Sequence, residues 1–245
     1  MALPSPTFDP RPWPAAVVAL LETGAAPVDA VFDMDGTLLG RDIGDELVGW
    51  LLERGHHPPA FAARAADHAA YVQAVRGWDT PDQFVLSAII AQGLTLDELA
   101  AQVRACLTAR IPLRGPVVAL ARALDAAGHR VWILTGSAEV VGRAVAAELG
   151  LDPDRVVGLR LAIDPETGRI TDRVIPPVTC GDGKVHAATS RIGPRVGFTI
   201  GDSWTDLPLL QAAAIGVAVP SLDGRLGPLA RAAGIPVLLP DDLGG

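Results

Sequence analysis

Cysteine is scarce in this chain of 245 residues: there are two, Cys106 and Cys180, far apart in the sequence. Their spacing matches no metal-binding or redox motif, so we expect idle thiols in a reducing compartment. No apolar run approaches the roughly 20 residues that a helix needs to cross a bilayer. The N-terminus contains prolines and lacks the basic region typical of a secretory signal. These absences predict a cytoplasmic protein that does not use a membrane.

Positive charge is also scarce, because 20 Lys and Arg residues stand against 28 Asp and Glu residues, a formal net charge of -8. This balance argues against nucleic acid or an anionic membrane as the main partner. It still allows an anionic small-molecule substrate, since one local cation can dominate a site. About half of the residues, 49%, are hydrophobic, enough for a sizeable core.

Apolar segments alternate with helical ones through most of the chain. Such alternation predicts right-handed crossovers and a parallel sheet with helices on both faces. We therefore expect an α/β fold with a three-layer, Rossmann-like core. The expected strands cover residues 28–34, 129–136, 196–202, 215–220 and 235–240, with a hairpin over 156–176. The expected core helices cover residues 13–23, 116–128, 138–150, 184–193, 206–214 and 224–234.

Residues 41–113 interrupt this alternation directly after the first strand, and their pattern predicts helices only. We interpret this segment as an inserted all-helical cap. The α/β hydrolase core is then formed by residues 1–40 and 114–245. An alanine-rich stretch, 59–77, is expected to form one helix of the cap.

Two helix starts within this segment carry capping residues. Thr80 precedes Pro81 and has Gln83 three positions later, and Thr95 has Glu98 at the same offset. A threonine followed three residues later by Gln or Glu is typical of a capping box. We therefore expect helices to begin at residues 81 and 96.

Polar residues follow the expected strands at their carboxyl ends, which is where ligands bind in an open parallel sheet. We expect these residues to converge on one site. They are Asp33 and Asp35 after the first strand, Thr135, Gly136 and Ser137 after "VWIL", Lys184 at the start of a helix, and Asp202 and Asp206 in "GDSWTD".

Converging carboxylates create an electrostatic problem. Two of them 4 Å apart repel by roughly 4 kcal/mol at an effective dielectric constant of 20. A divalent cation with oxygen ligands solves it, and Mg2+ is the ion that suits few protein ligands and a phosphate. Lys184 adds a fixed positive charge, and Thr135 with the N–H groups near Gly136 and Ser137 offers donors to an anion. A site for a cation and an anion together favours phosphoryl transfer.

The two aspartates of "DMDGT" then have separate uses. One carboxylate can attack phosphorus and form an aspartyl-phosphate. A second carboxyl group nearby can protonate the leaving alcohol and afterwards deprotonate water. Gly36 allows the sharp turn that aims both side chains.

"DMDGT", the threonine of "ILTGS", Lys184 and "GDSWTD" resemble, in this order, the motifs of the haloacid dehalogenase-like hydrolase superfamily. The resemblance implies that Asp33 is the nucleophile and a metal ligand. It implies that Asp35 is the general acid/base and binds the metal through its main-chain carbonyl. Thr135, with Gly136, and Lys184 would hold the phosphoryl group, while Asp202 would bind Mg2+ and Asp206 would support the site. The presence of Asp35 favours a phosphatase over a dehalogenase.

A helical insert after the first motif is similar to the phosphoserine-phosphatase-like branch. In that branch the first motif usually ends in Ser-Thr, and a glutamate nine residues after the nucleophile contacts the substrate amine. This chain has Gly36-Thr37 and Asp42 at those places. "GRDIGDE" and "VIPPVTCGDGK" also resemble phosphorylcholine-phosphatase-like members. Asp42 is therefore a candidate substrate contact, although it also suits the N-terminus of a helix.

The function predicted is hydrolysis of a small phosphomonoester, with an amine-bearing substrate of the phosphoserine or phosphocholine type. Two alternatives use the same residues. A phosphotransferase or phosphomutase would pass the phosphoryl group to another hydroxyl. A receiver-like phospho-acceptor module would keep it without turnover, although Asp35 and the inserted helices argue against such a module.

Overall fold

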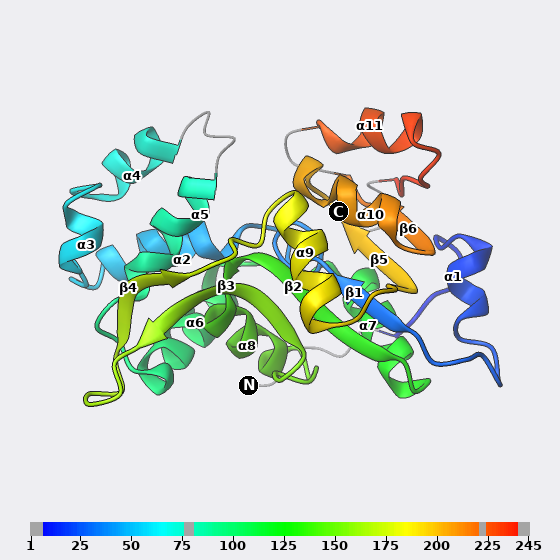
Figure 1. Ribbon diagram of the computed structural model, residues 1–245, viewed down its shortest axis with the longest axis horizontal. Helices are drawn as coiled ribbons and strands as arrows, with labels where there is room; N and C mark the ends of the chain where they lie inside the picture. The colour runs from blue at the N-terminus through cyan, green and yellow to red at the C-terminus, as the bar shows by residue number, and fades with distance from the viewer. Residues whose placement is uncertain (1–6, 76–80, 221–223, 240–245) are drawn as a thin grey trace.

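The computed structural model describes residues 7–75, 81–220 and 224–239. The described chain forms a six-stranded sheet with the order β4-β3-β2-β1-β5-β6 (Figure 1). Neighbouring strands are parallel except β3 and β4, which form the expected antiparallel hairpin. The strands are β1 Asp29–Phe32, β2 Arg130–Ala138, β3 Val156–Ile163, β4 Ile170–Ile175, β5 Phe198–Gly201 and β6 Ile215–Ala218. The α/β fold class is thereby confirmed.

Alternate strand residues point to opposite faces of this sheet, and helices pack against the apolar residues on each face. Val31, Leu134 and Val157 pack with Ala187 of α9 and Leu209 of α10. The neighbouring strand residues, Phe32, Ile133 and Val156, belong to a larger apolar cluster that contains buried residues of α7 and α8. The result is three layers. The helices of these layers and of the chain ends are α1 Ala15–Ala19, α7 Gly115–Ala126, α8 Glu139–Glu148, α9 Asp182–Arg191, α10 Leu207–Ala212 and α11 Leu226–Ala232.

The segment between β1 and α7 is helical, as the sequence predicts, and lies over one end of the sheet (Figure 1). Its buried side chains join the larger apolar cluster of the core. The division of the chain into a core and a cap stays a prediction. The helices of the segment are α2 Ile43–Leu52, α3 Pro59–Ala62, α4 His68–Val75, α5 Pro81–Ala88, the 3-10 turn η1 Ile89–Ala91 and α6 Leu96–Arg110.

The single alanine-rich helix expected over 59–77 is wrong, because α3 and α4 are separate. The Asp67 side chain accepts a hydrogen bond from the Ala70 N–H at 2.8 Å, so it starts α4 as a cap. The ring centroids of Phe61 and Tyr71 lie 5.9 Å apart, and both rings are buried. The break between the two helices therefore lets the rings of Phe61 in α3 and Tyr71 in α4 pack against each other in the core.

Of the two expected capping boxes, the one at Thr95 can be compared with the structure. At Thr95 the box is present: Glu98 N–H donates to the Thr95 hydroxyl at 3.2 Å, and Thr95 N–H donates to the Glu98 carboxylate at 2.8 Å. α6 begins where the sequence predicts. The other expected start, at Pro81 after Thr80, cannot be compared, because residues 76–80 lie outside the described residues; α5 is described over Pro81–Ala88.

The two ends of the chain differ from expectation. α1 is shorter than 13–23: it ends at Ala19, and beyond it the Leu21 and Glu22 N–H groups donate to carbonyls only three residues back. The Leu20 carbonyl accepts a hydrogen bond from Nε2 of His129 at 2.7 Å. The strand expected over 235–240 is absent from the described residues, where only Val237 bridges Ala218. Pro236 lacks an N–H donor, so it limits further pairing. None of the described helices is long and apolar enough to span a membrane.

Candidate active site

The carboxyl ends of β1, β2 and β5 lie side by side and bring the predicted residues together. Asp33 directly follows β1, and its N–H donates to the Ile200 carbonyl of β5 at 3.0 Å. Asp202 directly follows β5, and Thr135 lies near the end of β2. The parallel register therefore places residues from three distant parts of the chain at one edge of the sheet.

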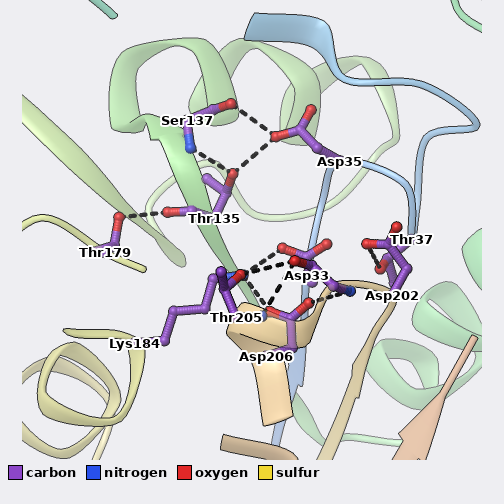
Figure 2. A network of polar contacts seen from close by, with 11 residues as sticks. Asp33, Asp35, Thr37, Thr135, Ser137, Thr179, Lys184, Asp202, Thr205 and Asp206 are labelled. Atoms are coloured by element: carbon purple, nitrogen blue, oxygen red, sulfur yellow. Dashed lines mark hydrogen bonds and ion pairs between the residues drawn. The ribbon is translucent and has the colours of Figure 1, made fainter. Parts of the chain in front are cut away.

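Three carboxylates gather at this edge, from Asp33, Asp202 and Asp206. One oxygen of each lies within 4.8 Å of the others, and all three side chains are buried. Lys184, at the start of α9, is buried beside them. Its Nζ donates to Asp33 Oδ1 at 2.7 Å and also to Asp206 Oδ1 (Figure 2). The structure thus brings these four side chains together, and three of them, Asp33, Lys184 and Asp202, line one cavity.

The cluster holds more negative than positive charge. Burial, and then repulsion from Asp206, raise the pKa of Asp33 to about 7, although Lys184 acts in the opposite direction. Burial, and then repulsion from Asp33 and Asp206, raise the pKa of Asp202 well above its ordinary value. Burial disfavours the charged form of Lys184, yet Asp206 and Asp33 outweigh it and raise the pKa of the ammonium. An added divalent cation would relieve this repulsion, and three carboxylates suit a hard ion such as Mg2+.

Asp35 points away from the carboxylate cluster. Its Oδ1 accepts a hydrogen bond from Ile43 N–H at 2.8 Å, and its Oδ2 accepts from the hydroxyls of Ser137 at 2.8 Å and Thr135 at 3.1 Å (Figure 2). These bonds lower the pKa of Asp35, but burial is the larger effect and raises it. Two aspartates two positions apart therefore occupy different environments.

The turn after Asp35 depends on its small residue and its hydroxyl. Gly36 has φ +75°, and a Cβ at this position would overlap the Asp202 carboxylate. Thr37 is fully buried, and its hydroxyl donates to Asp202 Oδ1 at 3.3 Å. The first motif thus positions Asp202 as well as presenting its own two aspartates.

The "TGS" segment differs in detail from the expected anion site. Ser137 N–H donates to the Thr135 hydroxyl at 3.0 Å, so this N–H is engaged within the segment. β2 continues to Ala138, and α8 begins only at Glu139, so Gly136 and Ser137 do not form the first turn of a helix. Gly136 lines a cavity of about 170 Å³ together with Asp33 and Lys184. Gly136, rather than Ser137, is thus the main-chain group of this segment that faces the cluster.

A second cavity, of about 150 Å³, adjoins the first on the side of the helical segment. Asp42, Gln83 and Phe84 line both cavities, and Asp45 lines the second. Asp42 is also the N-cap of α2, because its side chain accepts from Asp45 N–H at 2.9 Å. Burial, and then the carboxylates of Asp35 and Asp45, raise the pKa of Asp42 well above its ordinary value. Asp42 therefore caps α2 and also lines both cavities, and its contact with a substrate stays a prediction.

Several residues at the site were not singled out from the sequence as members of it. Thr37 belongs to the first motif, so its position could have been inferred from "DMDGT". Thr179 donates to the Thr135 carbonyl at 2.6 Å, and Phe84 lies against Gly136, where a Cβ would come within 2.7 Å of the ring. Nothing in the local sequence around Phe84 or Thr179 indicates these long-range contacts.

Comparison with known proteins agrees with this geometry. The sequence model of the haloacid dehalogenase-like hydrolase family matches residues 30–211, most of the chain. "Phosphoserine phosphatase SerB1" of Mycobacterium tuberculosis (strain H37Rv) is 31% identical over 114 residues, which are 44% of this chain and 35% of that relative. The chain thus spans about a third of that relative's length. "Phosphoserine phosphatase" of Albidiferax ferrireducens is 27% identical over 195 residues, 76% of each chain.

A solved structure supports the same fold. A protein of unknown function from Bordetella pertussis Tohama I superposes with a TM-score of 0.70 at 22% identity, over 87% of this chain and 99% of that one.

Proposed function

Because the chain belongs to the haloacid dehalogenase-like hydrolase family, we propose that it is a Mg2+-dependent phosphomonoesterase that forms an aspartyl-phosphate on Asp33. The observation that carries this proposal is that two carboxyl groups, both following strand β1, lie in different surroundings. Asp33 lies in the acidic cluster with Lys184, whereas Asp35 is held by hydroxyls outside it. Two carboxyl groups in different environments can act as a nucleophile and as an acid.

In the first step the Asp33 carboxylate attacks phosphorus, and the bond from phosphorus to the leaving oxygen breaks. Asp35 gives its proton to that oxygen, and an alcohol leaves. Burial raises the pKa of Asp35, which favours the protonated form that this step needs. In the second step Asp35 takes a proton from a water molecule, and the oxygen of that water attacks phosphorus. The bond to Asp33 breaks, and inorganic phosphate is released.

Lys184 and Gly136 are the groups that would face the phosphoryl oxygens. Lys184 Nζ lies 2.7 Å from Asp33 Oδ1, within reach of a phosphoryl group bound to that carboxylate. Asp33, the main-chain carbonyl of Asp35 and Asp202 would hold Mg2+, with Asp206 supporting them. When bound, the ion would neutralise charge on the phosphoryl group. The excess of carboxylates over cations in the cluster supports this assignment.

The second cavity would hold the leaving group, since it adjoins the first and shares Asp42, Gln83 and Phe84 with it. Asp42 and Asp45 make this cavity acidic, which favours a substrate whose leaving group carries an amine or a quaternary ammonium. The face of Phe84 would add a cation–π contact. Phosphoserine is one substrate to test, since two of the similar proteins are named phosphoserine phosphatases. Phosphoethanolamine and phosphocholine are the other amine-bearing or quaternary ammonium esters to test.

The test measures inorganic phosphate released from 4-nitrophenyl phosphate and from the amine-bearing esters, with Mg2+ present. We expect Asp33→Asn to abolish release from every substrate, because the amide is not a nucleophile. Release to water, without transfer to an added alcohol or sugar, separates a phosphatase from a phosphotransferase. Full activity of Asp33→Asn would refute the assignment of Asp33 as the nucleophile.

The same assay tests the substrate class through Asp42→Asn. Asparagine caps a helix as well as aspartate does, so the substitution removes charge without removing the cap of α2. We expect KM for the amine-bearing ester to rise roughly tenfold, about 1.4 kcal/mol, while KM for the aryl ester stays unchanged. The exposed Asp97 in the first turn of α6 provides the control Asp97→Asn. Equal effects of Asp42→Asn on both substrates would contradict an amine contact.

A further inference from the structure

Thr179 is buried in the loop between β4 and α9 and has no part in the phosphatase steps described above. Its side chain is 2% exposed. Its hydroxyl donates a hydrogen bond to the main-chain carbonyl of Thr135 at 2.6 Å, across 44 positions of sequence. The loop that carries Thr179 continues directly into α9 and Lys184. A single hydroxyl therefore links the lysine-bearing loop to the "TGS" segment.

The bond falls where the sheet is irregular. β2 and β3 pair at Leu134 with Val157 and again at Ala138 with Leu159, and the register shifts between these points. Thr135 and Gly136 lie within this shift, where the regular ladder does not set the direction of each peptide group. A buried donor at this point determines that direction instead.

The direction of one carbonyl decides the direction of the next N–H. The Thr135–Gly136 peptide is a planar trans amide, so its C=O and its N–H point to opposite sides. Figure 2 shows the bond from Thr179 meeting the Thr135 carbonyl on the side that faces away from Asp35. The Gly136 N–H consequently points to the other side, and Gly136 lines the cavity that contains Asp33 and Lys184.

Other contacts leave this N–H as the group of the segment that can meet an anion. Ser137 N–H is engaged with the Thr135 hydroxyl at 3.0 Å, and that hydroxyl in turn donates to Asp35 at 3.1 Å. The ring of Phe84 lies against Gly136, so it restricts rotation of the peptide. A donor fixed in advance stabilises developing negative charge without reorganisation during the reaction.

We propose that Thr179 is a positioning residue, which holds the Thr135–Gly136 peptide so that the Gly136 N–H is aimed at an oxygen of the phosphoryl group. This inference rests on the proposed phosphatase activity. Thr179 itself contacts neither the substrate nor the reacting atoms. Its removal should therefore weaken binding of the phosphoryl group and slow its transfer, and should leave recognition of the leaving group unaltered.

The test compares Thr179→Val, which keeps the shape and loses the donor, with Thr179→Ser, which keeps the hydroxyl. With 4-nitrophenyl phosphate and Mg2+, we expect Thr179→Val to lower kcat roughly 10- to 100-fold, somewhat less than direct loss of an oxyanion donor. The inhibition constant of inorganic phosphate should rise about tenfold in the same variant. Thr179→Ser should stay within about threefold of the original protein in both.

Thr171→Val is the matched control, because the Thr171 hydroxyl also donates to a main-chain carbonyl, that of Ala162, at 2.8 Å but outside the site. It should leave kcat and phosphate inhibition unchanged. Thermal midpoints are measured for all variants, and Thr179→Ala provides the same comparison if the valine variant does not fold. Unchanged phosphate inhibition in a folded Thr179→Val or Thr179→Ala protein would overturn the proposal, as would failure of Thr179→Ser to retain activity.

A calorimetric titration with inorganic phosphate separates this inference from the proposed function. If the original protein binds phosphate but hydrolyses no ester, the proposed function fails, and weaker phosphate binding by Thr179→Val still supports the positioning role. If the original protein hydrolyses the aryl ester and Thr179→Val matches it in kcat and in phosphate affinity, the proposed function stands and the positioning role is refuted.

Discussion

At the scale of single residues, Gly36 is the position at which the site leaves no room for a larger side chain. Gly36 has a positive φ of 75°, and its Cα lies so close to Asp202 that a Cβ would overlap the carboxylate. Two separate demands therefore fall on one position: a backbone conformation that favours glycine, and close approach of a carboxylate. These demands can be separated by substitution.

We expect Gly36→Ala to lower kcat with an aryl phosphate roughly 100-fold, because displacing Asp202 by about 1 Å misplaces a catalytic group. Its stability should fall by about 1–2 kcal/mol from the left-handed backbone. Gly55→Ala is the control, since Gly55 has φ +78° and nothing within 4 Å of its added Cβ. That variant should lose similar stability and keep full activity. Comparable loss of activity in both would show that backbone strain, and not contact with Asp202, is responsible.

At the scale of secondary structure elements, the helical segment and the sheet are joined near the start of α6. Gly93 N–H donates to the Ile170 carbonyl at 2.8 Å, and Ile170 N–H donates to the Leu94 carbonyl at 2.9 Å. The next residue, Thr95, begins α6 with its capping box and bridges to Arg169. The capping box of Thr95 and Glu98 thus fixes the beginning of α6 at the point where the chain leaves the edge of β4.

Thr95→Ala should lower the free energy of unfolding by about 1 kcal/mol, because it removes the hydroxyl that accepts from Glu98 N–H. For a chain of this size we expect the thermal midpoint to fall by about 2–4 °C. Thr108→Ala in the last turn of the same helix is the control, since alanine is a better helix former than threonine. A midpoint for Thr95→Ala equal to that of Thr108→Ala would contradict a stabilising cap.

At the scale of the whole molecule, the buried acids of the site are a place where charge repulsion lowers the stability of the fold. The protein carries a formal net charge of -8, and three of its acids are buried around one lysine. Folding without a divalent ion therefore keeps carboxylates close together in a poorly solvated place, which raises the pKa values of Asp33 and Asp202. An ion that binds the folded chain alone stabilises it through mass action.

Saturating Mg2+ should raise the thermal midpoint relative to protein in EDTA. At a concentration 100 times the dissociation constant the gain is about 2.7 kcal/mol. That corresponds to roughly 5–10 °C for a chain of this size. Asp202→Asn should lose most of the shift, and Asp172→Asn, an exposed acid of β4, should retain it. A midpoint that does not respond to Mg2+ would contradict a metal site among these acids.

The sequence by itself was enough to predict the alternation of strands and helices, the hairpin and the close approach of Asp33, Lys184, Asp202 and Asp206. Hydrophobic periodicity decides which residues are buried in each element, and a parallel sheet brings strand ends to one edge. Turn and cap residues are local signals, so the start of α6 at Thr95 was also predictable. In the described residues 235–239 the expected strand is reduced to one bridge between Val237 and Ala218, because Pro236 offers no N–H to a longer ladder.

Only the tertiary structure decided what the individual side chains contact. It placed Asp35 with Ser137 and Thr135 instead of with the other carboxylates, and it brought Thr179 to the Thr135 carbonyl. These contacts join residues about 100 and 44 positions apart, so no local pattern encodes them. Their geometry follows from the register of the strands and from packing, which set positions to within an ångström, whereas sequence periodicity sets only the face of an element.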